Sequence, residues 1–146
     1  MTYEDILYDE TDGVATITIN RPDRYNAFRG QTCMELIDAF HRAGWNKDIG
    51  VIVFTGAGEK AFCTGGDQGA HEGQYDGRGL IGLPVEELQR LIREVPKPVI
   101  ARVNGFAIGG VSAPPTWRGL WARNGPGKSG TCAASIPPNR HWNGAW

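Results

Sequence analysis

Lys60-Ala-Phe-Cys-Thr-Gly-Gly-Asp-Gln68 is the most informative segment of the chain. It follows a run of β-branched and aromatic residues, Val51–Thr55, and the turn signal Gly56-Ala-Gly58. Two adjacent glycines after a buried strand let the backbone adopt left-handed conformations and let a ligand approach closely. Backbone N–H groups exposed in such a loop can stabilise a developing oxyanion. The segment therefore indicates a candidate ligand-binding loop.

A second pair of glycines follows a second predicted strand. Residues 98–103 form an apolar run, Asn104-Gly105 is a turn signal, and Phe106-Ala-Ile-Gly-Gly110 comes next. If the two strands are parallel neighbours, both Gly-Gly loops lie at the same edge of the sheet, where open α/β folds bind ligands. Two backbone N–H groups could then converge on one carbonyl oxygen.

The N-terminal part of the chain predicts an α/β fold. Asp12-Gly13, between the apolar runs 6–8 and 14–19, indicates a β-hairpin. Residues 31–43 have the period of an amphipathic helix that ends at Gly44, and residues 49–55 read as a buried parallel strand. This order of elements indicates a right-handed βαβ crossover.

Helical spacing also predicts which side chains face the core. In the first helix these are Cys33, Leu36, Ile37 and Phe40. A second helix begins near Pro84, whose fixed φ suits a first helical turn. Its apolar stripe consists of Val85, Leu88, Leu91, Ile92 and Val95.

Composition excludes several classes of protein. The chain has 146 residues and a formal net charge of −1, which gives no reason to expect nucleic acid or an anionic membrane as a partner. No apolar run approaches the length of a membrane span, and the N-terminus lacks the pattern of a signal peptide. Three cysteines without metal-like spacing indicate reduced thiols, no metal site and a cytoplasmic location.

Single residues in these segments have simpler interpretations that remain open. Asp67 is either the cap of a following helix or a group beside the ligand. Arg24 is either a solvated surface charge or a phosphate contact. Cys63 reads as a small buried residue, because no histidine lies near it in sequence. Tyr75 faces a ligand or simply belongs to a polar loop.

In combination these segments resemble the crotonase (enoyl-CoA hydratase/isomerase) superfamily. The resemblance rests on residues 56–68 and 105–110, together with Ile19-Asn-Arg-Pro22 and Asn26-Ala-Phe28, and it covers residues 1–110. Within the superfamily the chain looks most like the 2-ketocyclohexanecarboxyl-CoA hydrolases and the related 1,4-dihydroxy-2-naphthoyl-CoA synthases. Asp76-Gly-Arg-Gly79 and residues 82–88 favour the hydrolases.

The resemblance implies a fold, a ligand and an assembly. The fold is a spiral of ββα repeats, of which residues 1–110 supply the N-terminal half. The ligand is an acyl-CoA thioester, with coenzyme A entering as part of the substrate and no other cofactor. The family forms homotrimers or dimers of trimers. The most similar reaction is the ring-opening hydrolysis of a cyclic 2-ketoacyl-CoA, and the synthase and hydratase or isomerase reactions remain alternatives.

The resemblance also implies which residues form the site. Gly66 and Gly110 supply the two N–H donors of an oxyanion hole for the thioester oxygen. The remaining positions contact the CoA and acyl groups: Arg24, Tyr25, Ala27, Ala61, Thr64, Gly65, Asp67, Gln68, Tyr75 and Gly109.

Residues 111–146 depart from the family pattern. They are rich in Gly, Pro, Ser and Trp, have no helical or strand period, and lack the segment that carries the family's acid–base residues. Regrouping the back-translated codons after Gly110 gives a string that resembles a later part of the family. We therefore hypothesise that this tail is an out-of-frame, disordered translation of a shortened gene. The DNA sequence across codons 105–120 tests the hypothesis.

Loss of the family's C-terminal elements has an expected physical consequence. Val99, Ile100 and Phe106 would expose apolar surface, which favours aggregation. We therefore expect a poorly stable chain with weak or absent catalysis. An acyl-CoA-binding fragment without activity is accordingly an alternative function of a different class.

Overall fold

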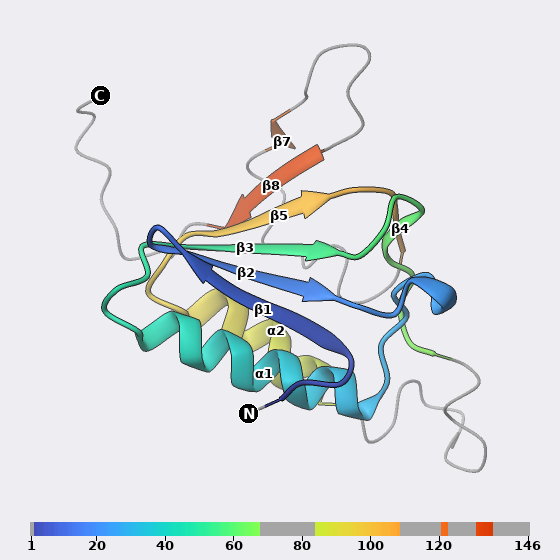
Figure 1. Cartoon of the computed structure of the whole chain (residues 1–146), viewed down its shortest axis with the longest axis horizontal. Coiled ribbons are helices and arrows are strands. Elements are labelled where there is room, and N and C mark those ends of the chain that lie inside the picture. The colour runs from blue at the N-terminus through green and yellow to red at the C-terminus, as the bar shows by residue number, and fades with distance from the viewer. Residues whose placement is uncertain (1, 68–83, 109–120, 123–130, 136–146) are drawn as a thin grey trace.

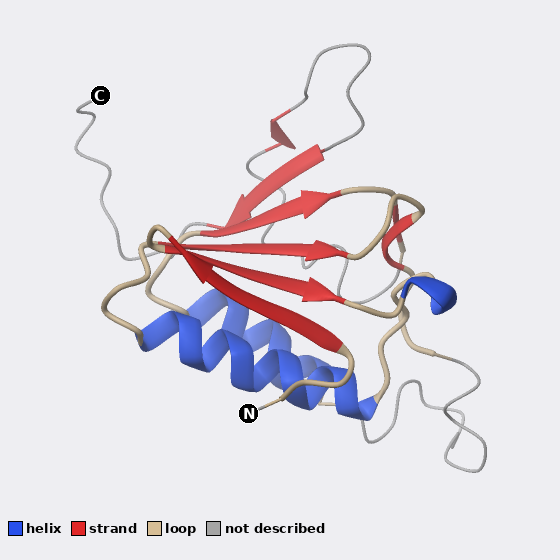
Figure 2. Cartoon of the chain, viewed as in Figure 1, coloured by secondary structure: helices blue, strands red, loops and turns tan. Residues whose placement is uncertain are grey.

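The computed structural model describes residues 2–67, 84–108, 121–122 and 131–135. Within these residues, six strands form one sheet in the order β1-β2-β3-β5-β8-β7, and β4 and β6 form a second, two-stranded sheet. Both α-helices pack against the same face of the larger sheet, as Figures 1 and 2 show. No helix in this part of the chain is long and apolar enough to cross a bilayer.

The predicted hairpin is confirmed. β1 (Ile6–Thr11) pairs antiparallel with β2 (Val14–Ile19), and Asp12-Gly13 forms the connection. Both turn residues have positive φ, 50° for Asp12 and 77° for Gly13. A type I′ turn requires this at its two central residues, which is why the Asp-Gly pair specifies it.

The βαβ order is also confirmed. β2 and β3 (Val51–Gly56) are parallel neighbours joined through α1 (Gly30–Trp45). β3 is in turn parallel to β5 (Val99–Val103), and α2 (Val85–Glu94) precedes β5 in the chain. Right-handed crossovers that add strands in one direction place their helices on one face, as is seen here.

The core lies between the helices and the sheet. The predicted stripe of α1 is buried at Cys33, Leu36 and Phe40, whereas Ile37 is half-buried. The Phe54 ring on β3 makes edge-to-face contacts with Phe40 of α1, at 5.5 Å between centroids, and with Phe62, at 5.2 Å. The predicted stripe of α2 is buried throughout: Val85, Leu88, Leu91, Ile92 and Val95.

The C-terminal end of α1 differs from the sequence prediction. The helix does not stop at Gly44 but continues to Trp45. Gly44 instead leaves room for Val95, because a Cβ at position 44 would lie 3.2 Å from the Val95 side chain. The ammonium of Lys97 donates to the carbonyls of Ala43, at 2.7 Å, and Asn46, so it satisfies acceptors that the helix end leaves open.

The tail contributes two strands that its sequence pattern did not predict. β8 (Thr131–Ser135) pairs antiparallel with β5, and β7 (Trp121–Ala122) pairs with β8. The division of the chain at residue 110 and the frame hypothesis stay predictions.

Exposure of the three apolar side chains near β5 is mixed. The expected exposure of Val99 is wrong, because this side chain faces the helices and is completely buried. Ile100 is half-buried. Phe106 is 64% exposed, as expected.

The end of β3 offers a test of close packing. A Cβ on Gly56 would lie 2.4 Å from the Phe62 carbonyl oxygen and 2.6 Å from Asn26 Nδ2. We expect Gly56→Ala to lower the free energy of unfolding by about 3 kcal/mol, because backbone atoms must move to admit the methyl group. Urea denaturation measures the change.

Gly50→Ala is the matched control. A Cβ on Gly50 has only the Gly13 carbonyl oxygen nearby, at 3.8 Å, so this variant should be close to wild type. Equal stability of the two variants would contradict the packing at Gly56.

Candidate functional site

A short parallel pair of strands brings together the chain segments that precede the two Gly-Gly pairs of the sequence. β4 (Ala61–Cys63) pairs with β6 (Phe106–Ala107). In Figure 1 this pair lies beyond the C-terminal ends of β3 and β5. The Phe106 N–H donates to the Lys60 carbonyl at 3.0 Å, and the Ile108 N–H donates to the Cys63 carbonyl at 2.9 Å. The chain segments that follow β4 and β6 therefore begin side by side.

The sequence predicted this proximity through a different pairing. It placed both loops directly after β3 and β5, which are indeed parallel neighbours. In the structure the loops instead follow β4 and β6, which the sequence pattern had not identified as strands. Strands of three and two residues are too short to show an alternating pattern.

Residues Thr64–Asp67, named here the Gly-Gly loop, are fixed by Phe28. The Phe28 N–H donates to the Gly65 carbonyl at 2.9 Å, and the Phe28 carbonyl accepts from the Asp67 N–H at 2.8 Å. These bonds make a parallel bridge between Phe28 and Gly66. In such a bridge the N–H of Gly66 points away from Phe28.

The Gly66 N–H is consequently available to a ligand. Gly66 is half-buried, and none of the described residues accepts a hydrogen bond from its N–H. Gly65 has a φ of 92°, which a residue with a Cβ rarely adopts. Gly65 thus provides the bend, and Gly66 provides a donor directed outward.

Asn26 joins the loop before α1 to the loop before β4. Its buried amide Nδ2 donates to the carbonyls of Ala57, at 2.9 Å, and Ala61, at 2.7 Å, while its Oδ1 accepts from the Arg21 N–H at 3.0 Å. Asn26 and Tyr25 both have positive φ, 55° and 51°. Asparagine tolerates this conformation better than most residues, so the position suits both its backbone and its side chain.

A cluster of charged groups lies behind the Gly-Gly loop. The Arg21 guanidinium donates to Asp67 Oδ2 at 2.8 Å and to the Ala27 carbonyl, and it lies 3.7 Å from Asp5 Oδ1. Arg29 binds the same Asp5 carboxylate through two hydrogen bonds, at 2.8 and 2.9 Å. Buried charges are tolerated when they are paired and hydrogen-bonded in this way.

The hydroxyl of Thr32 completes the shell around Asp5 by donating to Oδ2 at 2.5 Å. Burial by itself raises the pKa of the Asp5 carboxyl, but the hydrogen bonds from Arg29 and Thr32 and the charges of both arginines outweigh this effect. The pKa therefore lies below its ordinary value of 3.8. Asp5 is a structural anion at neutral pH.

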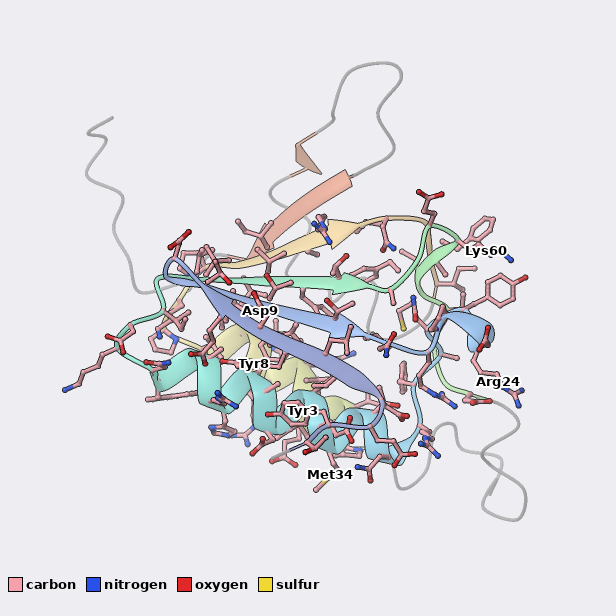
Figure 3. All side chains as sticks on the ribbon, in the orientation of Figure 1. Tyr3, Tyr8, Asp9, Arg24, Met34 and Lys60 are labelled. Atoms are coloured by element: carbon pink, nitrogen blue, oxygen red, sulfur yellow. The ribbon has the colours of Figure 1, made fainter. Side chains whose placement is uncertain are left out.

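A small pocket opens between the segment before α1 and the turn after β3. It has a volume of about 180 Å³ and lies between residues 22–26 and residues 57–61. Tyr25 and Ala61 line it, as does Lys60. In Figure 3, Lys60 and Arg24 lie at the same end of the molecule, away from Tyr3 and Met34. Because ligand pockets usually span about 300–1,000 Å³, this pocket suits part of a ligand.

The predicted site residues fall into two groups. Those that the structure describes lie in two segments, residues 21–28 and residues 61–67: Arg24, Tyr25, Ala27, Ala61, Thr64, Gly65, Gly66 and Asp67. Ala27 is buried, Arg24 and Tyr25 are exposed, and the Thr64 hydroxyl donates to the Tyr25 carbonyl at 3.2 Å. Four predicted residues lie outside the described residues: Gln68, Tyr75, Gly109 and Gly110.

Asp67 forms an ion pair, and Cys63 is a buried thiol. Asp67 is paired with Arg21, an interaction that neither earlier interpretation of this residue had foreseen. Burial raises the pKa of the Cys63 thiol to about 11, and burial and the nearby Cys63 raise that of Cys33 to about 12. Both thiols are therefore protonated at neutral pH, as the prediction of a small buried residue at Cys63 requires.

Sequence reasoning missed two residues of the site. Arg21 and Asn26 were recognised as parts of motifs but were not assigned to the site. The available signal for Asn26 was its place directly before the apolar pair Ala27-Phe28, which is buried in the structure. A polar residue in that position is a candidate for a buried hydrogen-bonding role. Nothing in the local sequence indicated that Arg21 reaches Asp67, which is 46 positions away.

Metal ligands of the usual kind are not clustered in the described region. No group of three or more His, Cys, Asp or Glu side chains there is placed to hold an ion.

The sequence profile of the family described as enoyl-CoA hydratase/isomerase matches residues 9–112. The chain belongs to this family. The match includes the second half of β1 and all of β2, both described α-helices, both short strands of the second sheet and the Gly-Gly loop. Its fold is accordingly the mixed α/β fold of the crotonase type.

Solved structures of family members are similar over most of this chain. An enoyl-CoA hydratase from Bacillus anthracis is 31% identical with a TM-score of 0.67, over 73% of this chain and 42% of that one. An enoyl-CoA hydratase/isomerase from Xanthobacter autotrophicus Py2 is 32% identical with a TM-score of 0.61, over 75% and 42%. An enoyl-CoA hydratase from Mycobacterium avium subsp. paratuberculosis K-10 is 27% identical with a TM-score of 0.58, over 70% and 37%.

The alignments span about two fifths of the length of these family members.

Asn26 provides a test of how the site of this family member is held. We expect Asn26→Ala to lower the free energy of unfolding by about 3 kcal/mol, because the Ala57 and Ala61 carbonyls lose their buried donor. Chemical denaturation measures the loss. Asn20→Ala is the control, since Asn20 is exposed; a similar loss in both variants would contradict the role of the Asn26 amide.

Asp5 gives a test in pH. A lowered pKa in the folded state contributes stability that is present above the unfolded value of about 3.9 and disappears as pH falls through the folded value. We expect Asp5→Asn to lower the free energy of unfolding by about 3 kcal/mol at pH 7. Below about pH 4 the difference in this free energy from wild type should shrink.

Denaturation midpoints at several pH values measure this dependence. Asp9→Asn, on the exposed side of β1, should stay close to wild type at every pH. A loss for Asp5→Asn that does not change with pH would contradict the ionic role.

Proposed function

We propose that this chain binds an acyl-CoA thioester whose carbonyl oxygen accepts a hydrogen bond from the Gly66 N–H. One observation carries the proposal: the Phe28–Gly66 bridge leaves this N–H pointing away from Phe28, three residues beyond the end of β4, the strand that pairs with β6. Gly110, outside the described residues, is the second donor in the proposal. It lies two residues beyond Ile108, whose N–H is bonded to β4.

Two N–H groups directed at one oxygen suit a thioester in particular. Removing a proton next to a thioester carbonyl, or attacking its conjugated double bond, places negative charge on that oxygen. Fixed donors stabilise such charge, and each contributes about 3–4 kcal/mol in comparable sites. The thioester itself acidifies the neighbouring carbon, so the proposed chemistry requires no cofactor beyond the coenzyme A of the substrate.

The pocket between residues 22–26 and 57–61 is the proposed position for part of the CoA group. Tyr25, Ala61 and Lys60 line it, together with the acidic residues Asp23 and Glu59. Arg24 is exposed on the same side and is available to a CoA phosphate. Gln68, Tyr75 and Gly109 remain proposed contacts of the acyl and CoA groups.

The reaction that we propose is ring-opening hydrolysis of a cyclic 2-ketoacyl-CoA such as 2-ketocyclohexanecarboxyl-CoA. Water attacks the ring ketone, the bond between that carbon and the α-carbon breaks, and the electron pair forms the thioester enolate. This choice rests on the sequence of residues 76–79 and 82–88. A 1,4-dihydroxy-2-naphthoyl-CoA synthase would form a carbon–carbon bond through the same kind of enolate.

Enoyl-CoA hydration is the second candidate. Two of the similar solved structures are described as enoyl-CoA hydratases, which favours it. Binding without catalysis is a candidate of another class. Asp67 follows Gly66 directly but is engaged by Arg21, so it is not offered as the acid–base group. A cytoplasmic location and a trimeric or hexameric assembly, as in the family, remain part of the proposal.

Calorimetry with matched ligands tests the binding proposal. A saturated acyl-CoA thioester and the corresponding S-alkyl-CoA thioether differ in the carbonyl oxygen. We expect the thioester to bind roughly 3–10 times more tightly, which corresponds to one net hydrogen bond. Equal affinities, or no binding of either ligand, would contradict it.

Turnover assays with 2-ketocyclohexanecarboxyl-CoA and crotonyl-CoA separate the candidate reactions. Ring opening supports the hydrolase, whereas hydration supports the second candidate. Thioester-selective binding with neither reaction supports the non-catalytic alternative.

A further inference from the structure

Arg21 lies behind the Gly-Gly loop and contacts both chain segments that orient Gly66. Its side chain is only 14% exposed. One nitrogen, Nη2, donates to Asp67, the residue that follows Gly66, and Nη1 donates to the carbonyl of Ala27, the residue that precedes Phe28. The guanidinium therefore links the two sides of the Phe28–Gly66 bridge.

These contacts add to a bridge that has only two backbone hydrogen bonds. The Gly66–Asp67 peptide is held through the Asp67 N–H, and the preceding peptide through the Gly65 carbonyl. Gly65 has wide backbone freedom, so the loop lacks the stiffness that a residue with a Cβ would supply. The ion pair at Asp67 supplies an additional restraint directly after the donor residue.

Arginine suits this position better than lysine. Its planar group presents several donors in fixed directions, so one side chain can bind the Asp67 carboxylate and the Ala27 carbonyl together. An ammonium at the end of a flexible chain has no such fixed directions.

The orientation of Arg21 is itself supported. Asp5 lies 3.7 Å from Nε, and Asp5 is held in turn by Arg29 and Thr32. Arg21 is thus paired with Asp5 and Asp67, and Arg29 is paired with Asp5 and, on its more exposed side, with Glu4. The arrangement keeps the Arg21 charge compensated even though its side chain is largely buried.

We propose that Arg21 is a positioning residue that fixes the direction of the Gly66 N–H and thereby the selectivity for ligands with a carbonyl oxygen. This inference rests on the proposed function. Arg21 touches no ligand in it, and acts through Asp67 and Ala27. The Ala27 carbonyl that Arg21 binds belongs to the same peptide as the Phe28 N–H, and that N–H holds the Gly65 carbonyl of the peptide that carries the Gly66 N–H. Loss of the Arg21 contacts frees the Ala27–Phe28 peptide and Asp67, so the Gly65–Gly66 peptide rotates and the donor no longer meets the oxygen at hydrogen-bond distance and angle.

The test compares Arg21→Met, Arg21→Lys and Asp67→Asn with wild type in the full chain. Each protein is titrated with a saturated acyl-CoA thioester and with its S-alkyl-CoA thioether, and the ratio of the two dissociation constants is taken. A thioester labelled with ¹³C at the carbonyl gives a second readout, because a hydrogen bond to that oxygen moves the carbon resonance downfield. General loosening of the fold would weaken the binding of both ligands and leave the ratio of their dissociation constants unchanged.

We expect the wild-type preference of roughly 3–10-fold to fall to about 1 in Arg21→Met, with the thioether affinity changing less than about twofold. The thioester preference of Asp67→Asn should also fall. Arg21→Lys should also lose most of the preference, because lysine keeps the positive charge but not the planar set of donors in fixed directions. The downfield shift of the carbonyl carbon should shrink in parallel.

Arg42→Met is the matched control. Arg42 pairs with Glu10 at 3.4 Å and lies over the Tyr8 ring at 4.5 Å, so it is a surface arginine of α1 that does not touch the loop. Its variant should keep the wild-type ratio. An unchanged ratio in folded Arg21→Lys and Arg21→Met would overturn the inference, and Arg21→Lys decides the matter if Arg21→Met does not fold. No preference in wild type would instead overturn the proposed function.

Discussion

The backbone bridge between Phe28 and Gly66 is the constraint on which the site depends. It fixes the Gly-Gly loop against the segment before α1 and leaves the Gly66 N–H directed outward. The β4–β6 pair then determines what lies next to that donor. The larger sheet and its helices form the base on which these two short pairings are built, because β4 and β6 follow β3 and β5 in the chain.

Polar contacts add to the apolar packing of Phe28, Phe62 and Cys63 in holding the loops at this end of the molecule. Asn26 supplies donors to two carbonyls that would otherwise be buried without a partner, and Arg21 compensates the charge of Asp67. Buried polar groups cost free energy unless every partner is in place, so such a network favours one arrangement over its alternatives. The apolar core beneath is more tolerant, since it requires mainly the right volume.

Long periodic segments were predictable from sequence, and short contacts were not. The Asp12-Gly13 hairpin and the stripes of α1 and α2 follow from turn chemistry and helical spacing, and the structure confirms them. The role of Gly44 inside α1 is to leave room for Val95, which comes from a distant part of the chain. β4 and β6 are too short for a pattern, and the Arg21–Asp67 pair exists only after the chain has folded. The sequence therefore indicated Gly66 but not the residues that orient it.

A crystal structure of the full chain with a bound acyl-CoA thioester tests the central claim most directly. The measured quantity is the distance from the Gly66 nitrogen to the thioester carbonyl oxygen. We predict a separation of about 3 Å with the Phe28–Gly66 bridge intact, as expected for an oxyanion-hole donor. A thioester oxygen more than about 4 Å from this nitrogen, beyond hydrogen-bond reach, would contradict it.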